Sequence, residues 1–196
     1  MENEKEFSPL ESLQLIRSMM EKTKADAADR SPVFLLWGWL IFGICILQFI
    51  LHAVLHSPYH YYVWSLTWIG VFITLYKYVF KKGKKAVVRT HIDDAMSYLW
   101  TGIGITFFAT VIVCSIGKWT NGYVPFIILY ALGTFVSGCI LKFKPFIFGG
   151  ILCWIIAPIA AACSYDVQIL FTALALLCSY IIPGHIFRKK YKKQNQ

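Results

Sequence analysis

Charge is scarce in this chain. Only 15% of its 196 residues are Asp, Glu, Lys or Arg, whereas 58% are hydrophobic. Soluble domains carry about 25% charged residues, because charged side chains cover much of their surface. The shortage excludes an ordinary cytosolic enzyme, a disordered chain and a secreted domain held together by disulfides.

Acidic residues are the scarcest charges, with 10 Asp and Glu against 19 Lys and Arg. None of the ten lies in the middle of an apolar segment. Proton-coupled pumps and many ion-driven carriers need a buried ionisable group, so its absence counts against that class. The basic residues form no stripe that alternates with aromatic residues, and we therefore expect no nucleic-acid partner.

Sequence motifs of catalytic, metal-binding and phosphate-binding sites are missing as well. The sequence holds no G-x-S-x-G, no H-E-x-x-H and no Gly-rich phosphate loop. No two of its cysteines are spaced C-x-x-C, so we interpret the six as small apolar packing residues. We predict that the chain is not an enzyme and that it has no catalytic residue and no bound cofactor.

Long apolar segments are what the chain does have. Six of them follow one another, at about 33–55, 62–80, 98–116, 123–141, 146–162 and 167–187. Each is close to the roughly 20 residues that cross about 30 Å of hydrocarbon as a helix. The segments are apolar on every side, which excludes the alternating strands of a barrel. The sequence therefore predicts an all-α polytopic membrane protein with six transmembrane helices in three hairpins.

Lys and Arg are distributed unequally around these segments. If all six cross the membrane, 18 of the 19 fall on one side with both termini, and only Lys118 falls on the other. Because such residues collect in cytoplasmic loops, we predict that both termini are cytoplasmic. The predicted parts are an N-terminal helix (1–31), a six-helix bundle (32–187) and a basic tail (188–196).

The first 31 residues predict a cytoplasmic amphipathic helix from Ser8 to about Asp29. Ser8-Pro9-Leu10-Glu11 has the pattern of a capping box, and a second cap at Ser31-Pro32 is expected to begin the first span. An apolar stripe at helical spacing lies between the two caps: Leu10, Leu13, Ile16 and Met20. Such a stripe usually packs on a membrane surface or on the bundle, and docking of a cytosolic partner is the other interpretation.

Two groups of residues are candidate sites within the bundle. His52 and His56 are four residues apart, so a helix places them on one face where they can share a metal ion. Histidines at a wet interface are also ordinary hydrogen-bonding residues. Pro158 is expected to kink the fifth segment. We predict a pocket near this kink, with packing as the alternative, lined by Gln48, Trp154, Pro158 and Gln168.

A smaller polar cluster precedes the third apolar segment and consists of His91, Asp93 and Asp94. An acidic pair can hold a metal ion bound to a diphosphate, but that chemistry needs further carboxylates and none follow. We interpret the cluster as the start of a helix, where negative charge is favourable.

The stretch from Glu11-Ser12-Leu13 to Leu35-Leu36-Trp37-Gly38-Trp39-Leu40 resembles the start of a family of small, uncharacterised bacterial inner-membrane proteins. The resemblance implies a bundle of spans in a bacterial inner (plasma) membrane, and it implies no known activity. In topology alone the chain is also similar to the substrate-binding subunits of vitamin importers, whose Ala-x-x-x-Ala pattern in the first span is absent here.

Two classes of function follow from these observations. The first is a non-catalytic integral membrane protein, a regulatory, sensory or accessory component that contacts a cytosolic partner. The alternative is a small-solute-binding subunit or facilitative transporter with a pocket inside the bundle. The lipid bilayer is the expected surrounding of either, and association with a second copy of the chain stays open.

Overall fold

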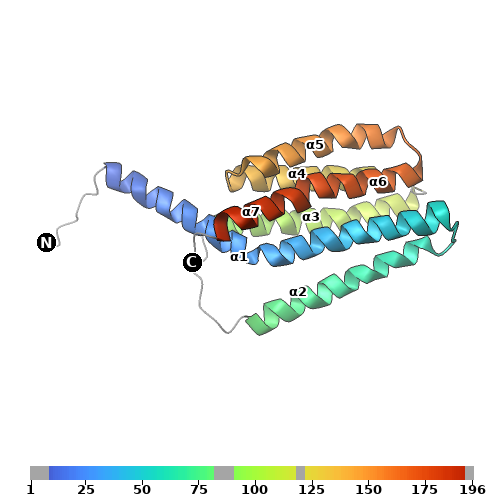
Figure 1. Cartoon of the computed structure of the whole chain (residues 1–196), viewed down its shortest axis with the longest axis horizontal. Coiled ribbons are helices and arrows are strands. Elements are labelled where there is room, and N and C mark those ends of the chain that lie inside the picture. The colour runs from blue at the N-terminus through green and yellow to red at the C-terminus, as the bar shows by residue number, and fades with distance from the viewer. Residues whose placement is uncertain (1–8, 82–90, 118–121, 193–196) are drawn as a thin grey trace.

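The computed structural model describes residues 9–81, 91–117 and 122–192. Within these residues the chain is helical and contains no strand. The helices, labelled in Figure 1, are α1 (Pro9–Phe49), α2 (Thr67–Lys81), α3 (His91–Ile116), α4 (Val124–Ile140), α5 (Lys144–Ala161), α6 (Tyr165–Leu176) and α7 (Ile182–Lys192). Three short helical turns of other geometry also occur. They are the π-helical turns η1 (Ile50–Val54) and η3 (Leu177–Ile181) and the 3₁₀ turn η2 (His60–Leu66).

Four helical stretches are long and apolar enough to cross a membrane: Ser31–Val54, His91–Ile116, Lys144–Ala161 and Tyr165–Tyr191. Helix α4 is apolar as well but has 17 residues, and α2 has 15 residues after the 3₁₀ turn η2. An all-helical fold with several membrane-length helices is thus confirmed for the described part of the chain. The full count of six spans stays a prediction.

Helix α1 runs without a break through the predicted boundary between the N-terminal helix and the first span. From Pro9, where the described residues begin, it continues unbroken through Pro32 to Phe49. The expectation that Ser31-Pro32 begins a new helix is therefore wrong. Pro32 removes one helical hydrogen bond, whereas stopping the helix would remove several and require a second nucleation.

The N-terminal part of α1 projects from the bundle, and the rest of α1 lies in it (Figure 1). Inside the bundle, α1 packs against α6 and α7, and α4 packs against α5 as a hairpin. Helix α2 contacts α1, and α3 contacts α4. No residue of α3 is buried, so α2 and α3 form the periphery of a bundle whose centre is α1, α4, α5 and α6.

Large apolar side chains are exposed over these peripheral helices. On α2 they include Trp68, Phe72 and Leu75, and on α3 they include Phe108 and Ile112. An exposed apolar surface of this extent marks contact with lipid or protein. Together with the membrane-length helices, it is the surface of a protein surrounded by a bilayer.

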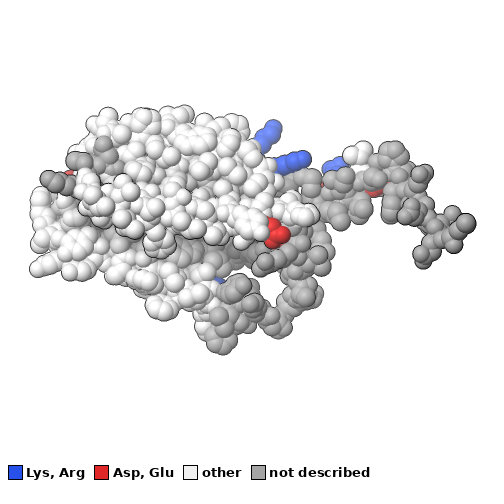
Figure 2. Space-filling model, turned by 180° about the vertical axis from the view of Figure 1, so that it is seen from behind, with Lys and Arg blue, Asp and Glu red and all other residues white. Residues whose placement is uncertain are grey.

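Charged side chains gather near one end of the bundle. Figure 2 shows an almost uncharged body, with blue Lys and Arg atoms near the end from which α1 projects. Basic residues of the α4–α5 turn, the start of α5 and α7 include Lys142, Lys144, Arg188, Lys189 and Lys190. The predicted basic loop at 82–90 and Lys118 lie outside the described residues.

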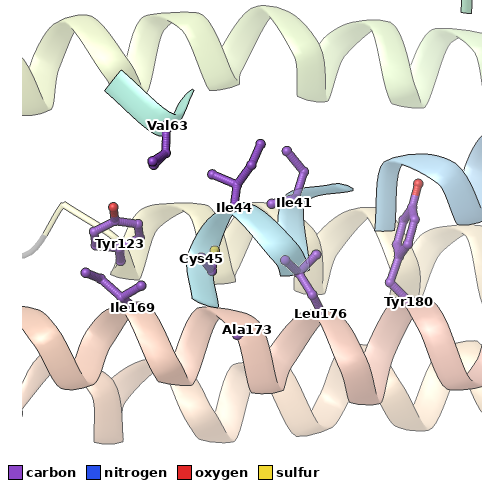
Figure 3. Packing of buried hydrophobic residues seen from close by; sticks show 9 residues of the cluster. All are labelled: Ile41, Ile44, Cys45, Val63, Tyr123, Ile169, Ala173, Leu176 and Tyr180. Carbon is purple, nitrogen blue, oxygen red and sulfur yellow. The ribbon is translucent and has the colours of Figure 1, made fainter. Parts of the chain in front are cut away.

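The centre of the bundle is a cluster of buried apolar residues. Helix α1 contributes Ile41, Ile44 and Cys45, and these meet Ile169 and Leu176 of α6 (Figure 3). A second buried cluster joins α4, α5 and α6. All six cysteines are free, and two of them are fully buried in these clusters. The prediction that these two cysteines are apolar packing residues is confirmed.

Candidate functional site

A buried polar cluster lies at the end of the bundle opposite the basic residues. It is assembled from the end of α1, the turns η1 and η2, the residue before α4 and the start of α6. Its members are Gln48, His52, His60, Trp64, Tyr123, Tyr165 and Asp166. Polar side chains are costly in an apolar bundle unless they bond to one another, which is why these residues meet.

Gln48 is the centre of this polar cluster and is only 1% exposed. Its Oε1 accepts hydrogen bonds from Trp64 Nε1 (2.6 Å) and from the hydroxyl of Tyr123. Its Nε2 donates to His60 Nδ1 (3.3 Å) and to the Tyr165 hydroxyl (3.5 Å). An indole N–H can only donate, so the bond from Trp64 fixes which end of the Gln48 amide is the oxygen. Every polar atom of the amide is used.

His60 is held as a neutral imidazole by this arrangement. An amide nitrogen only donates, so the bond from Gln48 requires an unprotonated Nδ1 on His60. Burial lowers the pKa of His60 below its ordinary value, and the neighbouring His52 lowers it further, while Asp166 acts in the opposite direction. The ring of His60 is thus a group whose protonation breaks a bond to Gln48.

The predicted metal-binding pair is separated by a change in helix geometry. The α-helix gives way to the π-helical turn η1 at residue 50, and the helix ends before His56, which has a positive φ of 49°. The exposed His56 ring bonds to the backbone carbonyl of Val54, two residues earlier (3.2 Å). His52 instead bonds to Asp166 and lies 4.3 Å from the His60 ring, centroid to centroid.

The described residues contain no group of three or more His, Cys, Asp or Glu that could hold a metal ion. They also show no hydroxyl or thiol of Ser, Thr or Cys bonded to the His52 or His60 ring. His52 therefore has an acidic partner, Asp166, but in the described residues neither His52 nor His60 has a Ser, Thr or Cys nucleophile bonded to its ring. Metal binding by His52 and His56 and the expected lack of enzyme activity both stay predictions.

The four residues of the predicted pocket do not come together. Gln48 belongs to the polar cluster, whereas Gln168 is buried on α6 and donates to the carbonyl of Cys163 (3.1 Å). Trp154 and Pro158 are exposed on the outer face of α5, where the Trp154 ring packs against Phe135. Helix α5 continues past Pro158 for three residues, so this proline lies in its last turn.

A cavity of about 310 Å³ lies instead near the end of the bundle that carries the basic residues. Its walls come from α1, α3, α4, α5 and α7, and they are formed mainly by aromatic, aliphatic and hydroxyl side chains. Reasoning from the sequence missed this cavity. Ser31 was interpreted there as a helix cap and Asp93 as part of a helix start, and neither pattern signals that the two residues share a cavity.

The stripe predicted for partner docking lies on the projecting part of α1. Leu10 and Leu13 are each 67% exposed. The side chains of Ile16 and Met20 lie outside the described residues. The two described leucines therefore cover no surface of the bundle.

The N-terminal stretch that resembles the small inner-membrane family forms this projecting part and the following turns of α1. Among known proteins, no family model, no curated protein and no solved structure matches this chain.

Proposed function

We propose that this chain is a non-catalytic integral membrane protein, a regulatory, sensory or accessory component whose N-terminal segment contacts a cytosolic partner. It crosses a bacterial inner membrane six times, with both termini in the cytoplasm. The observation that carries the proposal is the continuity of α1, which joins an exposed segment to the buried centre of the bundle in one helix of 41 residues.

A continuous helix couples its two ends mechanically. Near its C-terminal end, α1 is fixed by Gln48, whose hydrogen bonds reach η2, α6 and the residue before α4. Its middle part packs against α6 and α7. At its N-terminal end Leu10 and Leu13 are exposed. A rearrangement among the packed helices would therefore displace the exposed end, which is what a sensory or regulatory component needs.

Six crossings are supported by the lengths of the helical units. Helix α4 has 17 residues, and the predicted second segment, 62–80, is helical throughout in η2 and α2. The turns between consecutive units are short at Leu55–Tyr59 and Ala162–Ser164. The basic residues at the end from which α1 projects support cytoplasmic termini, because positive charge collects on that side of a membrane.

The docking role of α1 is tested by photo-crosslinking in cells. A benzoylphenylalanine residue replaces Leu10 or Leu13 in the full chain, and the matched control replaces Trp68, which is exposed on α2. We expect positions 10 and 13 to crosslink to one cytosolic protein and position 68 to crosslink to lipid. Equal crosslinking to lipid at all three positions would contradict docking.

A truncation separates docking from a structural role of the same segment. Removing residues 1–28 takes away no membrane-length helix, so we expect unchanged insertion and a similar melting temperature, with loss of the crosslinked partner. If the truncated protein instead melts clearly lower and loses no partner, the segment is a structural part of the bundle and the docking proposal is wrong.

The cavity favours a second candidate, a small-solute-binding subunit or facilitative transporter. Its volume of about 310 Å³ falls at the lower end of the range for small-molecule sites. In that case the solute would be small and would enter from the end of the bundle that carries the basic residues. Uptake of a solute by vesicles containing the purified protein would favour this candidate over the first.

A further inference from the structure

The cavity of about 310 Å³ lies where five helices meet. Each of four helices supplies an aromatic ring to its wall: Phe34 of α1, Trp100 of α3, Phe146 of α5 and Phe187 of α7. Because these residues lie far apart in the sequence, the cavity is a feature of the whole bundle and not of a single turn.

Two buried serines that line the cavity have hydroxyl groups without a hydrogen-bond partner in the described part of the chain. The atoms are Ser31 Oγ and Ser137 Oγ, and the two residues are only 5% and 3% exposed. Buried polar groups in proteins almost always bond to something. Thr134, which lines the same cavity, shows the usual arrangement in a helix, because its hydroxyl donates to the carbonyl of Tyr130, four residues earlier (2.7 Å). The two serine hydroxyls lack such a bond and are therefore able to bond to a molecule in the cavity.

Water alone suits this cavity poorly. Its volume of about 310 Å³ is far larger than the roughly 30 Å³ that one water molecule occupies. An ordered water needs two to four polar partners, and the wall consists largely of aromatic and aliphatic side chains. Two unpaired hydroxyls are too few to order the water that would fill the space. An apolar molecule with a polar group fits the wall better.

The aromatic rings of the wall indicate the shape of the apolar part. Phe34 and Trp100 stand edge to face, with centroids 6.1 Å apart, and Phe146 stands 5.8 Å from Phe34 in the same manner. All three residues line the cavity. Edge-to-face contacts stabilise aromatic pairs beyond the burial of their area. A ring that enters the cavity can make further contacts of this kind, so the wall favours a ring over a flexible chain.

We propose that this cavity binds a small aromatic alcohol or phenol. The ring of the ligand packs among Phe34, Trp100 and Phe146, and its hydroxyl group bonds to the hydroxyl of Ser31 or Ser137. Hydroxyl groups suit one another because each can donate one hydrogen bond and accept others. Such a ligand is uncharged, so its binding requires no counter-charge in the wall. A lipid chain would leave both serine hydroxyls unpaired.

This inference deepens the second candidate function, the small-solute-binding subunit, and rests on it for the use that is made of the bound molecule. Helix α1 supplies both Ser31 and Phe34 to the cavity, so the ligand also contacts the helix whose N-terminal part projects from the bundle. Binding to the purified protein requires neither transport nor a cytosolic partner. Failure of binding is therefore distinguishable from failure of solute uptake and from failure of crosslinking at positions 10 and 13.

The test is calorimetric titration of the purified full chain in detergent with 2-phenylethanol. Propylbenzene is the matched comparison, because a methyl group replaces the hydroxyl group in a molecule of the same length, and protein-free detergent gives the background for both probes. We expect saturable binding of 2-phenylethanol that is about fivefold tighter than that of propylbenzene, or more, because only the alcohol bonds to a serine. Propylbenzene binding that is equally tight would mean an unspecific apolar space, and no saturable binding of 2-phenylethanol would mean that the cavity does not hold this class of molecule. Either result overturns the proposal.

Serine variants locate the binding. The double variant Ser31→Ala/Ser137→Ala should bind 2-phenylethanol about fivefold more weakly, or more, and propylbenzene as before. The matched control is Ser115→Ala/Ser179→Ala, because these two serines bond to carbonyl groups of their own helices and do not line the cavity. The control should bind both probes as the original chain does.

Melting curves give a second measurement on the same variants. Replacing an unpaired buried hydroxyl breaks no hydrogen bond, so the variant without Ser31 and Ser137 should melt no lower than the original chain. A clearly lower melting temperature would show that these hydroxyls bond within the protein. Unchanged 2-phenylethanol binding in the folded variant, or equal weakening in the control, would show that they do not bond to the probe. Each of these results contradicts the proposal.

Discussion

Gln48 shows how one polar residue organises an end of an apolar bundle. Its amide uses both an acceptor and a donor, and its four partners come from η2, α6 and the residue before α4. In a low-dielectric environment a satisfied network of this kind is rigid, whereas leaving a single buried partner unpaired is costly. The function of Gln48 is therefore to hold the helix ends in one arrangement.

His60 makes this arrangement depend on pH. Burial and the neighbouring His52 lower its pKa in the folded chain, so the folded chain binds fewer protons than the unfolded chain near that pKa. The stability that neutral His60 gives to the folded chain is fully present above the ordinary histidine pKa of about 6.5. It is lost as the pH falls through the lowered pKa of His60 in the folded chain. We expect the melting temperature of the purified protein to fall between pH 7.5 and pH 5.

Two histidine variants test the assignment to His60. In His60→Asn the amide oxygen can accept the bond from Gln48 and cannot take up a proton, so the fall in melting temperature at low pH should shrink. The matched control is His56→Asn, because His56 is exposed outside the polar cluster. A control variant that flattens the pH profile as much as His60→Asn would rule out the assignment.

At the scale of elements, glycine brings α4, α5 and η3 close together. A Cβ atom on Gly150 of α5 would lie 2.8 Å from the carbonyl oxygen of Ala131 on α4. A Cβ on Gly149, the preceding residue, would lie 2.7 Å from the Cα of Ser179 in η3. Both obstacles are backbone atoms, which cannot move aside without shifting a helix. Small residues at such contacts are how helices associate within membranes.

Alanine substitutions measure this close packing. We expect Gly149→Ala and Gly150→Ala each to reduce the free energy of unfolding by about 1–3 kcal/mol, the usual cost of overpacking. The matched controls are Gly43→Ala and Gly104→Ala, where a Cβ meets nothing within 4 Å. These controls should be neutral or should stabilise by up to about 1 kcal/mol, because alanine favours helix. Equal losses at all four positions would show that the losses do not come from close packing at Gly149 and Gly150.

At the scale of the whole molecule, the number of crossings determines which loops face the cytoplasm. Four stretches are long enough by themselves, and α2 and α4 are shorter. If α2 crosses, the segment 82–90 lies on the same side as the N-terminus. If α2 does not cross, that segment lies on the opposite side. The positions 90 and 120 then exchange sides, since α3 separates them.

Cysteine labelling distinguishes these arrangements. In a variant whose six native cysteines are replaced, Thr90→Cys and Thr120→Cys are introduced one at a time and treated in intact cells with a reagent that cannot cross the membrane. Six crossings predict labelling at position 120 and none at position 90, because the basic loops stay inside. The reverse pattern would mean that α2 does not cross or that the whole protein has the opposite orientation, and labelling at both positions would exclude α3 as a span.

The sequence by itself determined the helical class and most helix boundaries of the described chain. Helix α3 has Asp93 and Asp94 in its first turn, where the sequence predicts acidic residues at the start of a helix. Helix α4 begins one residue after the predicted position. These features depend on neighbours in the sequence, such as the length of an apolar run or a cap. The unbroken course of α1 through Pro32 was missed, because it depends on the cost of stopping a helix that continues on both sides.

Only the tertiary structure decided which side chains meet. Gln48 was singled out as a pocket residue, yet its partner Tyr123 lies 75 residues away and Tyr165 lies 117 residues away. Trp154 lies on the outer face of α5, and the cavity formed around Ser31 and Ser137 instead. The physical reason is the uniform apolarity of the helices. In a soluble protein the polar face of a helix points to solvent, so the sequence identifies the opposite face as the buried one. A helix that is apolar all round gives no such signal. Its rotation in the bundle is set by packing against all of its neighbours at once.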